Sequence, residues 1–233
     1  MRVAAVLTGA GSGTRLGSEL PKALVPLGSV PMLAHAASRL VDAGITDLVV
    51  TAPHGHVADV ERLLFAAGIT QARCLPGGQT RQQSVSLALD AISSRAEWVL
   101  VHDAARALAP VSLIRSVVDA LLAGARAVIP GLAVVDTIKR VADGVVTGTP
   151  ERSSLVAVQT PQGFSRSLLQ HVHDLGAGLA GSEAAALSDD AGLVERFTDV
   201  PVEVVPGDER AIKITRPADL ALAEAMLESG AWR

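Results

Sequence analysis

The first residues that could do chemistry form a glycine-rich stretch close to the amino terminus. Gly9, Gly11 and Gly13 follow a short apolar run, and Arg15 and Lys22 come soon after. Glycine permits positive φ and close backbone approach, so consecutive N–H groups at a strand-to-helix turn can face an anion. The stretch, with its two cations, therefore predicts a phosphate-binding loop. A plain glycine turn that feeds a helix is the alternative if the loop is considered alone.

Two common nucleotide-binding motifs do not fit this loop. A G-x-G-x-x-G fingerprint counted from Gly9 needs glycine where Thr14 stands, and counted from Gly11 it needs glycine where Leu16 stands. A P-loop needs a Gly-Lys-Ser/Thr ending, which does not follow. A nucleotide held here must be bound by another arrangement.

A second polar position lies at the end of an apolar run. Asp103 follows residues 98–102, which read as a buried strand, and ligands collect at the carboxyl ends of strands in doubly wound sheets. Asp103 is therefore a candidate site residue, and capping of the following turn is the alternative.

The elements that must position these residues alternate along the chain. Strands are predicted from short apolar runs and helices from segments of helical period. This alternation predicts an α/β, Rossmann-like fold, with a mostly parallel sheet and helices on both faces, in one domain of residues 1–233. The expected strands are 3–7, 47–52, 98–102, 127–130 and 202–205, and the expected helices are 32–43, 57–67, 81–92, 111–123, 165–173 and 217–229.

The alternation weakens between residues 134 and 160. Residues 135–141 and 144–146 flank an Asp143-Gly144 pair, which is a hairpin signal. We expect a protruding β-hairpin dimerisation arm at about 134–156. An isolated hairpin is marginal in water, so the arm should pack on a second subunit. A hairpin that lies on its own domain is the alternative.

Composition limits the class of protein. Of the 233 residues, 49% are hydrophobic but 2% aromatic, and mean hydropathy is +0.38, so the chain is not an ordinary disordered one. Twenty basic residues against 24 acidic ones give a net charge of −4, which speaks against a nucleic-acid surface. With the single cysteine Cys74, no signal peptide and no apolar span of membrane length, we expect a cytoplasmic protein with no membrane partner.

Longer motifs narrow the class of enzyme. The pattern Gly11-x-Gly13-x-Arg15-Leu16-Gly17, followed by Pro21-Lys22, resembles the signature of enzymes that load a nucleotide onto a sugar or polyol phosphate. Other segments resemble the 2-C-methyl-D-erythritol 4-phosphate cytidylyltransferases of the non-mevalonate isoprenoid pathway, and the resemblance covers essentially the whole chain. These segments are 77–85, 99–106, 157–164, 188–191 and 212–220.

The resemblance implies a reaction and a set of residues. Family members condense CTP with methylerythritol phosphate and release pyrophosphate, with Mg²⁺ on the triphosphate. The resemblance then implies that Arg15, Lys22, Asp103 and Lys213 are catalytic, with Asp103 as an Mg²⁺ ligand or water anchor; that Ala10, Gly11, Gly13, Gly78, Arg81 and Ser84 bind the nucleotide; and that Arg106, Thr137, Arg152 and Thr160 bind the polyol phosphate.

Physical roles follow from that assignment. Arg15 suits a planar fork on phosphate oxygens, and Lys22 suits a compact point charge. Thr137 and Arg152 match positions that reach across a dimer, so each active site would be composite, as in a homodimer. His102 is expected to be structural, because a phosphate nucleophile at neutral pH carries no proton that a base must remove.

Several alternatives stay open at this point. Arg81 could cap or salt-bridge the helix that it opens, and Lys213, predicted on a last strand segment, could be an ordinary edge lysine. The chain could transfer CMP to ribitol 5-phosphate instead, or it could be a non-catalytic nucleotide-binding module on the same fold. The loop also departs from the family pattern at Gly9, where an extra glycine is expected to loosen the turn.

Overall fold

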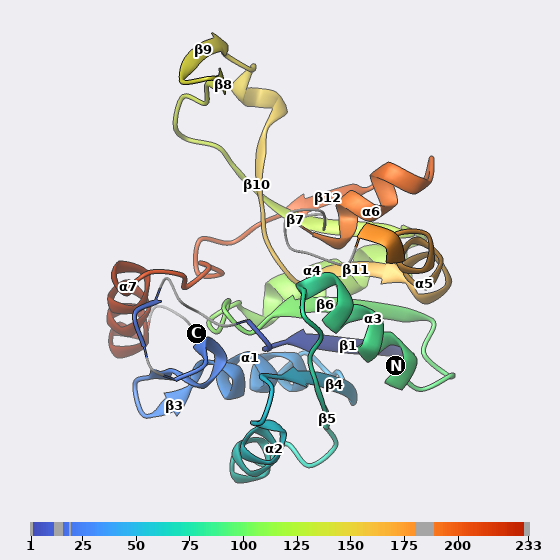
Figure 1. Ribbon diagram of the computed structural model, residues 1–233, viewed down its shortest axis with the longest axis vertical. Coiled ribbons are helices and arrows are strands. Elements are labelled where there is room, and N and C mark those ends of the chain that lie inside the picture. Colours follow the sequence, from blue (N-terminus) through green and yellow to red (C-terminus); the bar gives the residue numbers. More distant parts are fainter. Residues whose placement is uncertain (1, 12–15, 19, 180–188, 231–233) are drawn as a thin grey trace.

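The computed structural model describes residues 2–11, 16–18, 20–179 and 189–230. Its centre is a sheet with strand order β10-β7-β11-β6-β1-β4-β5, and β12 pairs with β7 beside that path (Figure 1). The strands of this sheet are β1 Val3–Thr8, β4 Asp47–Ala52, β5 Arg73–Pro76, β6 Trp98–Asp103, β7 Ala127–Ala133, β10 Val156–Val158, β11 Gln162–Ser165 and β12 Glu203–Pro206.

The remaining elements cover the sheet or extend from it. The helices are α1 Met32–Asp42, α2 Val57–Ala66, α3 Arg81–Ala91, α4 Val111–Leu122, α5 Arg166–Leu175, α6 Asp190–Phe197 and α7 Pro217–Ser229. Short pieces are β2 Pro26–Leu27, β3 Val30–Pro31, β8 Arg140–Ala142, β9 Val145–Gly148 and the 3₁₀ turns Lys22–Leu24, Arg152–Ser154 and Ala177–Leu179.

The central strands confirm the predicted fold class. The pairs β1–β4, β1–β6, β4–β5 and β7–β12 are parallel, whereas β11 lies antiparallel between β6 and β7. Parallel strands place their carboxyl ends at one edge of a sheet, where ligands bind in this class of fold. The sheet therefore brings the ends of β1, β4, β5 and β6 to one common edge.

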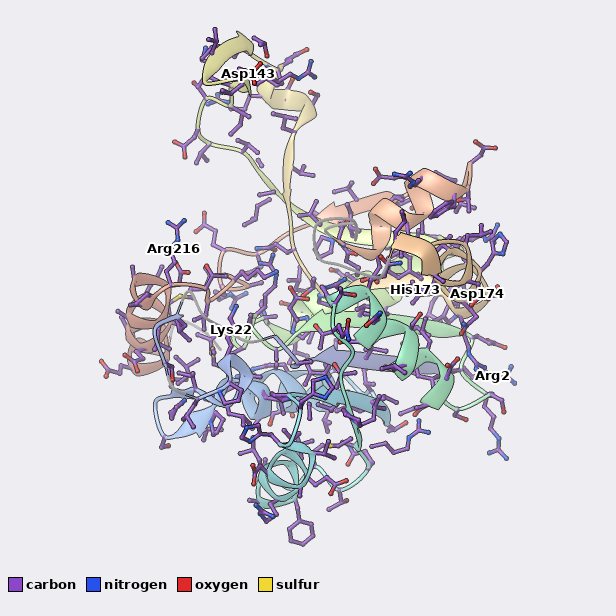
Figure 2. The ribbon with its side chains drawn as sticks, viewed as in Figure 1. Arg2, Lys22, Asp143, His173, Asp174 and Arg216 are labelled. Atoms are coloured by element: carbon purple, nitrogen blue, oxygen red, sulfur yellow. The ribbon has the colours of Figure 1, made fainter. Side chains whose placement is uncertain are left out.

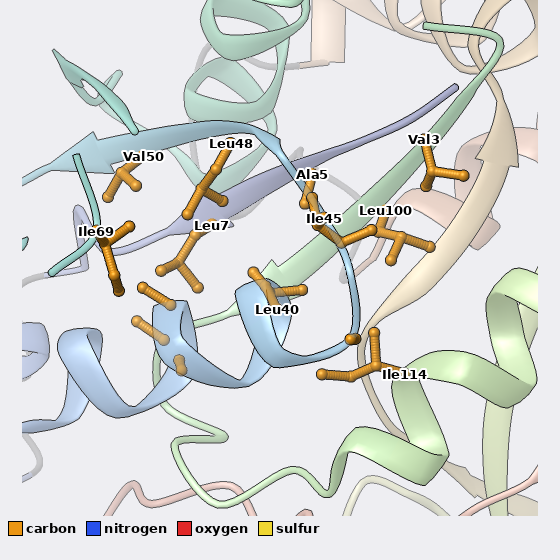
Figure 3. Close-up of a cluster of buried hydrophobic side chains, with 14 of the residues drawn as sticks. Val3, Ala5, Leu7, Leu40, Ile45, Leu48, Val50, Ile69, Leu100 and Ile114 are labelled. Atoms are coloured by element: carbon orange, nitrogen blue, oxygen red, sulfur yellow. The ribbon is translucent and has the colours of Figure 1, made fainter. Parts of the chain in front are cut away.

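Two hydrophobic layers hold the helices against the sheet. Successive side chains of a strand point to opposite faces, so Ala5 and Leu7 of β1 pack with α1, α2 and α4, and Ala4 and Val6 pack with α3, α5 and α6. Figure 3 shows the first layer, in which Leu40 of α1 lies against the strands. Because β1 is buried on both faces, its sequence is a continuous apolar run, as the prediction assumed.

The arm is present, and its turn has the expected geometry. Asp143 and Gly144 have φ values of 49° and 78°, and positive φ at both central residues is what a tight two-residue hairpin turn requires. The arm extends from β7 and β10 and stands away from the sheet and its helices (Figure 1).

Two predictions of local structure were wrong, and one helix was not predicted. Lys213 does not lie on a strand: residues 212–215 run outside the sheet, where the Ile214 N–H donates to the Ala105 carbonyl at 2.9 Å. Only 140–142 of the predicted 135–141 strand is regular. Helix α6 was not predicted, because its eight residues begin with acidic and small side chains and lack a long apolar period.

Within the described residues, no helix is long and apolar enough to cross a membrane.

Candidate active site

A cavity of about 720 Å³ opens at the carboxyl edge of the central strands. This volume lies within the range of small-molecule sites. Among the described residues that line it, Lys22, Arg81 and Lys213 carry cationic side chains and Asp103 alone carries a carboxylate. An excess of positive charge among small residues and backbone groups suits a polyanion.

One side of the cavity is built from small residues in close contact. A Cβ at Gly77 would lie 2.2 Å from the Cβ of Ala10, and a Cβ at Gly78 would lie 2.4 Å from that of Gln83, so neither position has room for a side chain. The Ser84 hydroxyl accepts from the Gly78 N–H at 3.0 Å and donates to the Thr80 carbonyl at 2.9 Å. Ser84 therefore fixes the backbone of this wall.

Gly9 has a packing reason that the sequence did not reveal. A Cβ there would lie 2.8 Å from Leu33 and 3.0 Å from the Thr51 carbonyl, to which the Gly9 N–H donates at 2.9 Å. The extra glycine lets the loop pack against β4, and the expectation that it loosens the turn stays a prediction.

Asp103 lines the same cavity and is surrounded by hydrogen-bond donors. Its carboxylate is 2.8 Å from Lys213 Nζ and 3.2 Å from Arg81 Nε, and it accepts from the Thr8 hydroxyl at 3.3 Å. Burial alone would raise the pKa of Asp103, but the charges of Arg81 and Lys213 hold that pKa well below its usual range. Asp103 is therefore ionised at neutral pH, and Lys213 reaches the cavity although it is not on a strand.

The side chains of Thr160 and His102 form a buried hydrogen-bonded pair next to Asp103. The Thr160 hydroxyl accepts from the Asp103 N–H at 3.1 Å and lies 2.9 Å from His102 Nδ1. Burial lowers the pKa of His102 to about 4, so this ring is neutral at physiological pH. His102 is therefore a buried hydrogen-bonding residue, as expected. Thr160 holds the backbone of Asp103, and its predicted role toward the polyol phosphate stays a prediction.

Arg106 is also buried and occupied within its own chain. Its Nη1 donates to the Ala211 carbonyl at 2.6 Å and its Nη2 donates to the Val158 carbonyl at 3.0 Å. Burial lowers the pKa of this guanidinium. Arg106 joins the segment before Lys213 to the end of β10, so the geometry shows a bracing residue, and its role toward substrate stays a prediction.

Arg81 connects Asp103 to a second buried carboxylate. Its Nη1 donates to Asp190 at 2.7 Å, and the other oxygen of Asp190 lies 3.0 Å from His173 Nε2. Burial alone would lower the pKa of Arg81, but Asp190 and Asp103 raise it. Figure 2 shows His173 on α5, well away from Lys22. Arg81 therefore forms salt bridges, here with Asp103 and Asp190, and its side chain also lines the cavity.

The structure brings most predicted site residues together. The cavity is lined by Ala10, Gly11, Lys22, Gly78, Arg81, Ser84, Asp103 and Lys213. Gly13 and Arg15 lie outside the described residues.

The two arm residues do not line the cavity of their own chain. Thr137 is exposed, and Arg152 donates to the Val135 carbonyl across the arm at 2.8 Å. Figure 2 labels Asp143 at the tip of the arm, far from Lys22.

Sequence reasoning missed four residues near the site. Thr8 was read only as the start of the glycine loop, and His54, which lines the cavity, carried no motif. Asp190 belonged to a segment noted for its resemblance but was given no role. His173 gave no signal at all, because its link to Asp190 depends on how α5 and α6 pack.

The donor set indicates how a divalent cation could be held. Among the described residues there is no cluster of three or more His, Cys, Asp or Glu side chains suited to a metal. Of the described residues that line the cavity, Asp103 is the one with a carboxylate, which is a hard oxygen donor. This chemistry fits Mg²⁺, which keeps several waters and binds through one or two carboxylates together with substrate phosphates.

Comparisons with known proteins agree on one family. The family model described as 2-C-methyl-D-erythritol 4-phosphate cytidylyltransferase matches residues 3–229. The chain is 48% identical over 228 residues to the protein of that name from Nocardia farcinica, covering 97% of this chain and 94% of the relative. It is 45% identical over 237 residues to the one from Streptomyces coelicolor, covering 97% and 85%.

A solved structure gives the same result. The crystal structure of 4-diphosphocytidyl-2C-methyl-D-erythritol synthase from Anaerococcus prevotii superposes with a TM-score of 0.83 at 28% identity. The superposition covers 97% of this chain and 98% of the other.

Proposed function

The chain belongs to the 2-C-methyl-D-erythritol 4-phosphate cytidylyltransferase family, and we propose that the cavity beside Asp103 is where it performs that reaction. The enzyme transfers CMP from CTP to 2-C-methyl-D-erythritol 4-phosphate and releases pyrophosphate. The family match supports this substrate over ribitol 5-phosphate. The observation that carries the site is the excess of cationic side chains over carboxylates among the described residues that line that cavity.

The reaction brings two anions together, so the protein must position them and stabilise charge. A phosphate oxygen of the alcohol attacks the α-phosphorus of CTP, a new P–O bond forms, and the bond to the pyrophosphate oxygen breaks. No base is needed, because the attacking oxygen carries no proton at neutral pH. Prepositioned cations stabilise the added charge of the five-coordinate state.

Lys22 and Lys213, which both line the cavity, supply that charge. Lys213 donates one ammonium hydrogen to Asp103, and an ammonium has three, so two can be donated to phosphate oxygens. Asp103 holds this lysine in place, because the carboxylate is buried and stays ionised. Arg15 is proposed as a further phosphate ligand from its sequence position.

The wall of small residues is proposed to bind cytidine. Ala10, Gly11 and Gly78 offer backbone groups, and the close contact of Gly77 with Ala10 leaves little space. When bound, Mg²⁺ supplies charge neutralisation on the triphosphate. Asp103 is the described residue that would hold it or anchor one of its waters.

The arm supports a homodimer with composite active sites. Its apolar side chains are exposed, with Val135 80% and Val145 65% accessible, and exposed β-branched residues on a thin hairpin favour burial against a partner. Thr137 and Arg152 cannot serve their own cavity from where they lie. We therefore propose that each pair binds the polyol phosphate in the other subunit's cavity, in a cytoplasmic enzyme.

An assay with two acceptors tests the function. Pyrophosphate release from CTP and Mg²⁺ is measured with methylerythritol 4-phosphate and, separately, with ribitol 5-phosphate. Release with the first acceptor and little with the second is expected. Release with ribitol phosphate alone would support that alternative, and release with neither would support a binding module.

A further inference from the structure

We propose that His173 is a positioning residue for CMP transfer, acting through Asp190 and Arg81 on the Asp103 carboxylate. The proposal rests on the function proposed above, since it assigns no chemistry to His173 itself. His173 lies on α5, outside the cavity lining, so its effect must pass through the side chains between.

An unbroken series of contacts connects His173 to the cavity. His173 Nε2 is 3.0 Å from Asp190 Oδ1, Asp190 Oδ2 is 2.7 Å from Arg81 Nη1, and Arg81 Nε is 3.2 Å from Asp103 Oδ1. Four elements contribute, namely α5, α6, α3 and the end of β6. The series ends at the carboxylate that also binds Lys213.

Because His173 and Asp190 are buried, the loss of a contact between them cannot be compensated by water. The side chain of His173 is 0% exposed and that of Asp190 is 1% exposed, so water cannot replace a lost partner. A buried carboxylate oxygen that loses its donor is left unsatisfied, and the carboxylate then seeks its nearest remaining cation. For Asp190 that cation is Arg81.

Arg81 is shared between two carboxylates, which is why the loss would reach the active site. If Asp190 recruits both ends of the guanidinium, the Arg81 Nε bond to Asp103 weakens. Asp103 then depends on Lys213 for its charge balance, and Lys213 is drawn away from the incoming phosphate. His173 prevents this by satisfying the second oxygen of Asp190.

The orientation of the His173 ring is itself supported. Ser86 Oγ of α3 lies 3.4 Å from Nδ1, so the ring is held from its other side while Nε2 faces Asp190. With Nε2 protonated, the ring donates to the carboxylate in its neutral form. The proposed role therefore needs a donor at this place and does not need a proton to move.

The test replaces the donor and then restores it. His173→Leu removes the donor, His173→Gln retains an N–H that can reach Asp190, and His171→Leu makes the same change at an exposed residue of the same helix. kcat is measured with both substrates saturating, and thermal unfolding of each variant is recorded. His173→Leu should lower kcat about tenfold, which corresponds to about 1.4 kcal/mol of transition-state stabilisation.

The control variants should behave differently from His173→Leu. His173→Gln should stay within about threefold of the wild-type kcat, and His171→Leu should match wild type. Equal kcat for His173→Leu and His171→Leu would overturn the proposal.

A double-mutant cycle separates positioning from general destabilisation. In an Arg81→Gln background, the His173→Leu change should alter kcat less than about twofold, because the route to Asp103 is already interrupted. An equal reduction in both backgrounds would show that His173 is only structural and would overturn the proposal. Absence of CMP transfer by the wild-type enzyme would instead refute the proposed function.

Discussion

The charged residues around Asp103 and the apolar residues of the arm differ in whether they find partners within one chain. Around Asp103 each carboxylate has a cation within 3.2 Å, supplied by the same chain. On the arm, Val135, Val141, Val145 and Val146 are each more than half exposed. One protomer therefore pairs the described charges of the proposed site within itself but leaves the apolar side chains of its arm exposed, which is why we propose that polyol-phosphate binding, rather than the placement of these charges, depends on assembly.

The largest expected effect is on kcat, and it compares a lysine of the cavity with a lysine of the arm. Lys22→Ala should lower kcat by about a thousandfold, because a prepositioned charge at a transition state contributes several kcal/mol. Lys139→Ala on the arm, where the ammonium donates to Thr149 at 2.7 Å, should change kcat less than about threefold. Steady-state turnover of both variants, with circular dichroism to confirm folding, is the measurement. Near-normal turnover of Lys22→Ala would contradict its role.

The next prediction tests whether the arm needs a second copy. Val146→Asp places a charge on an apolar face, so the dimer should dissociate, and turnover should fall about tenfold or more because the composite site is lost. Phe65→Asp is the matched control, since Phe65 is 73% exposed on α2, away from the arm. Light scattering and turnover are measured together. A monomeric Val146→Asp variant with full activity would rule out composite sites.

A smaller effect is expected at Arg152, in the 3₁₀ turn that follows β9 on the arm. Arg152→Ala should raise KM for the polyol phosphate about tenfold or more while KM for CTP changes less than about twofold, because a hydrogen bond to a charged group contributes roughly 1.5–3 kcal/mol and each 1.4 kcal/mol is about tenfold. Arg140→Ala, at an exposed arginine on β8, serves as the control. Initial rates with each substrate varied in turn give both constants. An equal rise in the two KM values would argue against a direct contact.

The sequence predicted the parts of both regions that depend on local pattern. The apolar run of β1, the position of Asp103 after β6 and the Asp143-Gly144 turn each follow from neighbouring residues. The approach of Gly77 to Ala10 and the bond from Ile214 to Ala105 could not be predicted, because they join segments that are distant in sequence.

The buried network shows the same limit more clearly. Arg81 and Asp190 are 109 residues apart, and their ion pair exists only because α3 and α6 pack on the same face of the sheet. From the sequence, Arg81 could either bind nucleotide or form a salt bridge. The structure shows that one guanidinium both lines the cavity and joins two carboxylates, which a one-dimensional pattern cannot indicate.

The last prediction concerns how the free energy of unfolding depends on pH through His102, the buried residue next to Asp103. The arm cannot show this effect, because residues 134–156 contain no histidine. Burial lowers the pKa of His102 from 6.5 to about 4. The unfolded chain therefore binds a proton that the folded chain excludes, and stability is lost as the pH falls from about 6.5 to about 4.

The size of that loss follows from the shift in the pKa of His102, and it is on the order of 3 kcal/mol for this one group.

His102→Asn should show a flatter fall in unfolding free energy across this range, measured by urea titration, while its kcat at neutral pH stays within about threefold of wild type. Burial also lowers the pKa of His35, but that contribution is common to both proteins, so their difference isolates His102. The lowered pKa values of Asp103 and Asp190 reduce stability from about pH 5 downward, and this contribution too is common to both proteins. Identical slopes in the two proteins would mean that His102 is not kept neutral by burial. The Thr160 hydroxyl, which accepts from the Asp103 N–H, would then be in contact with a charged imidazolium of His102 instead of a neutral ring.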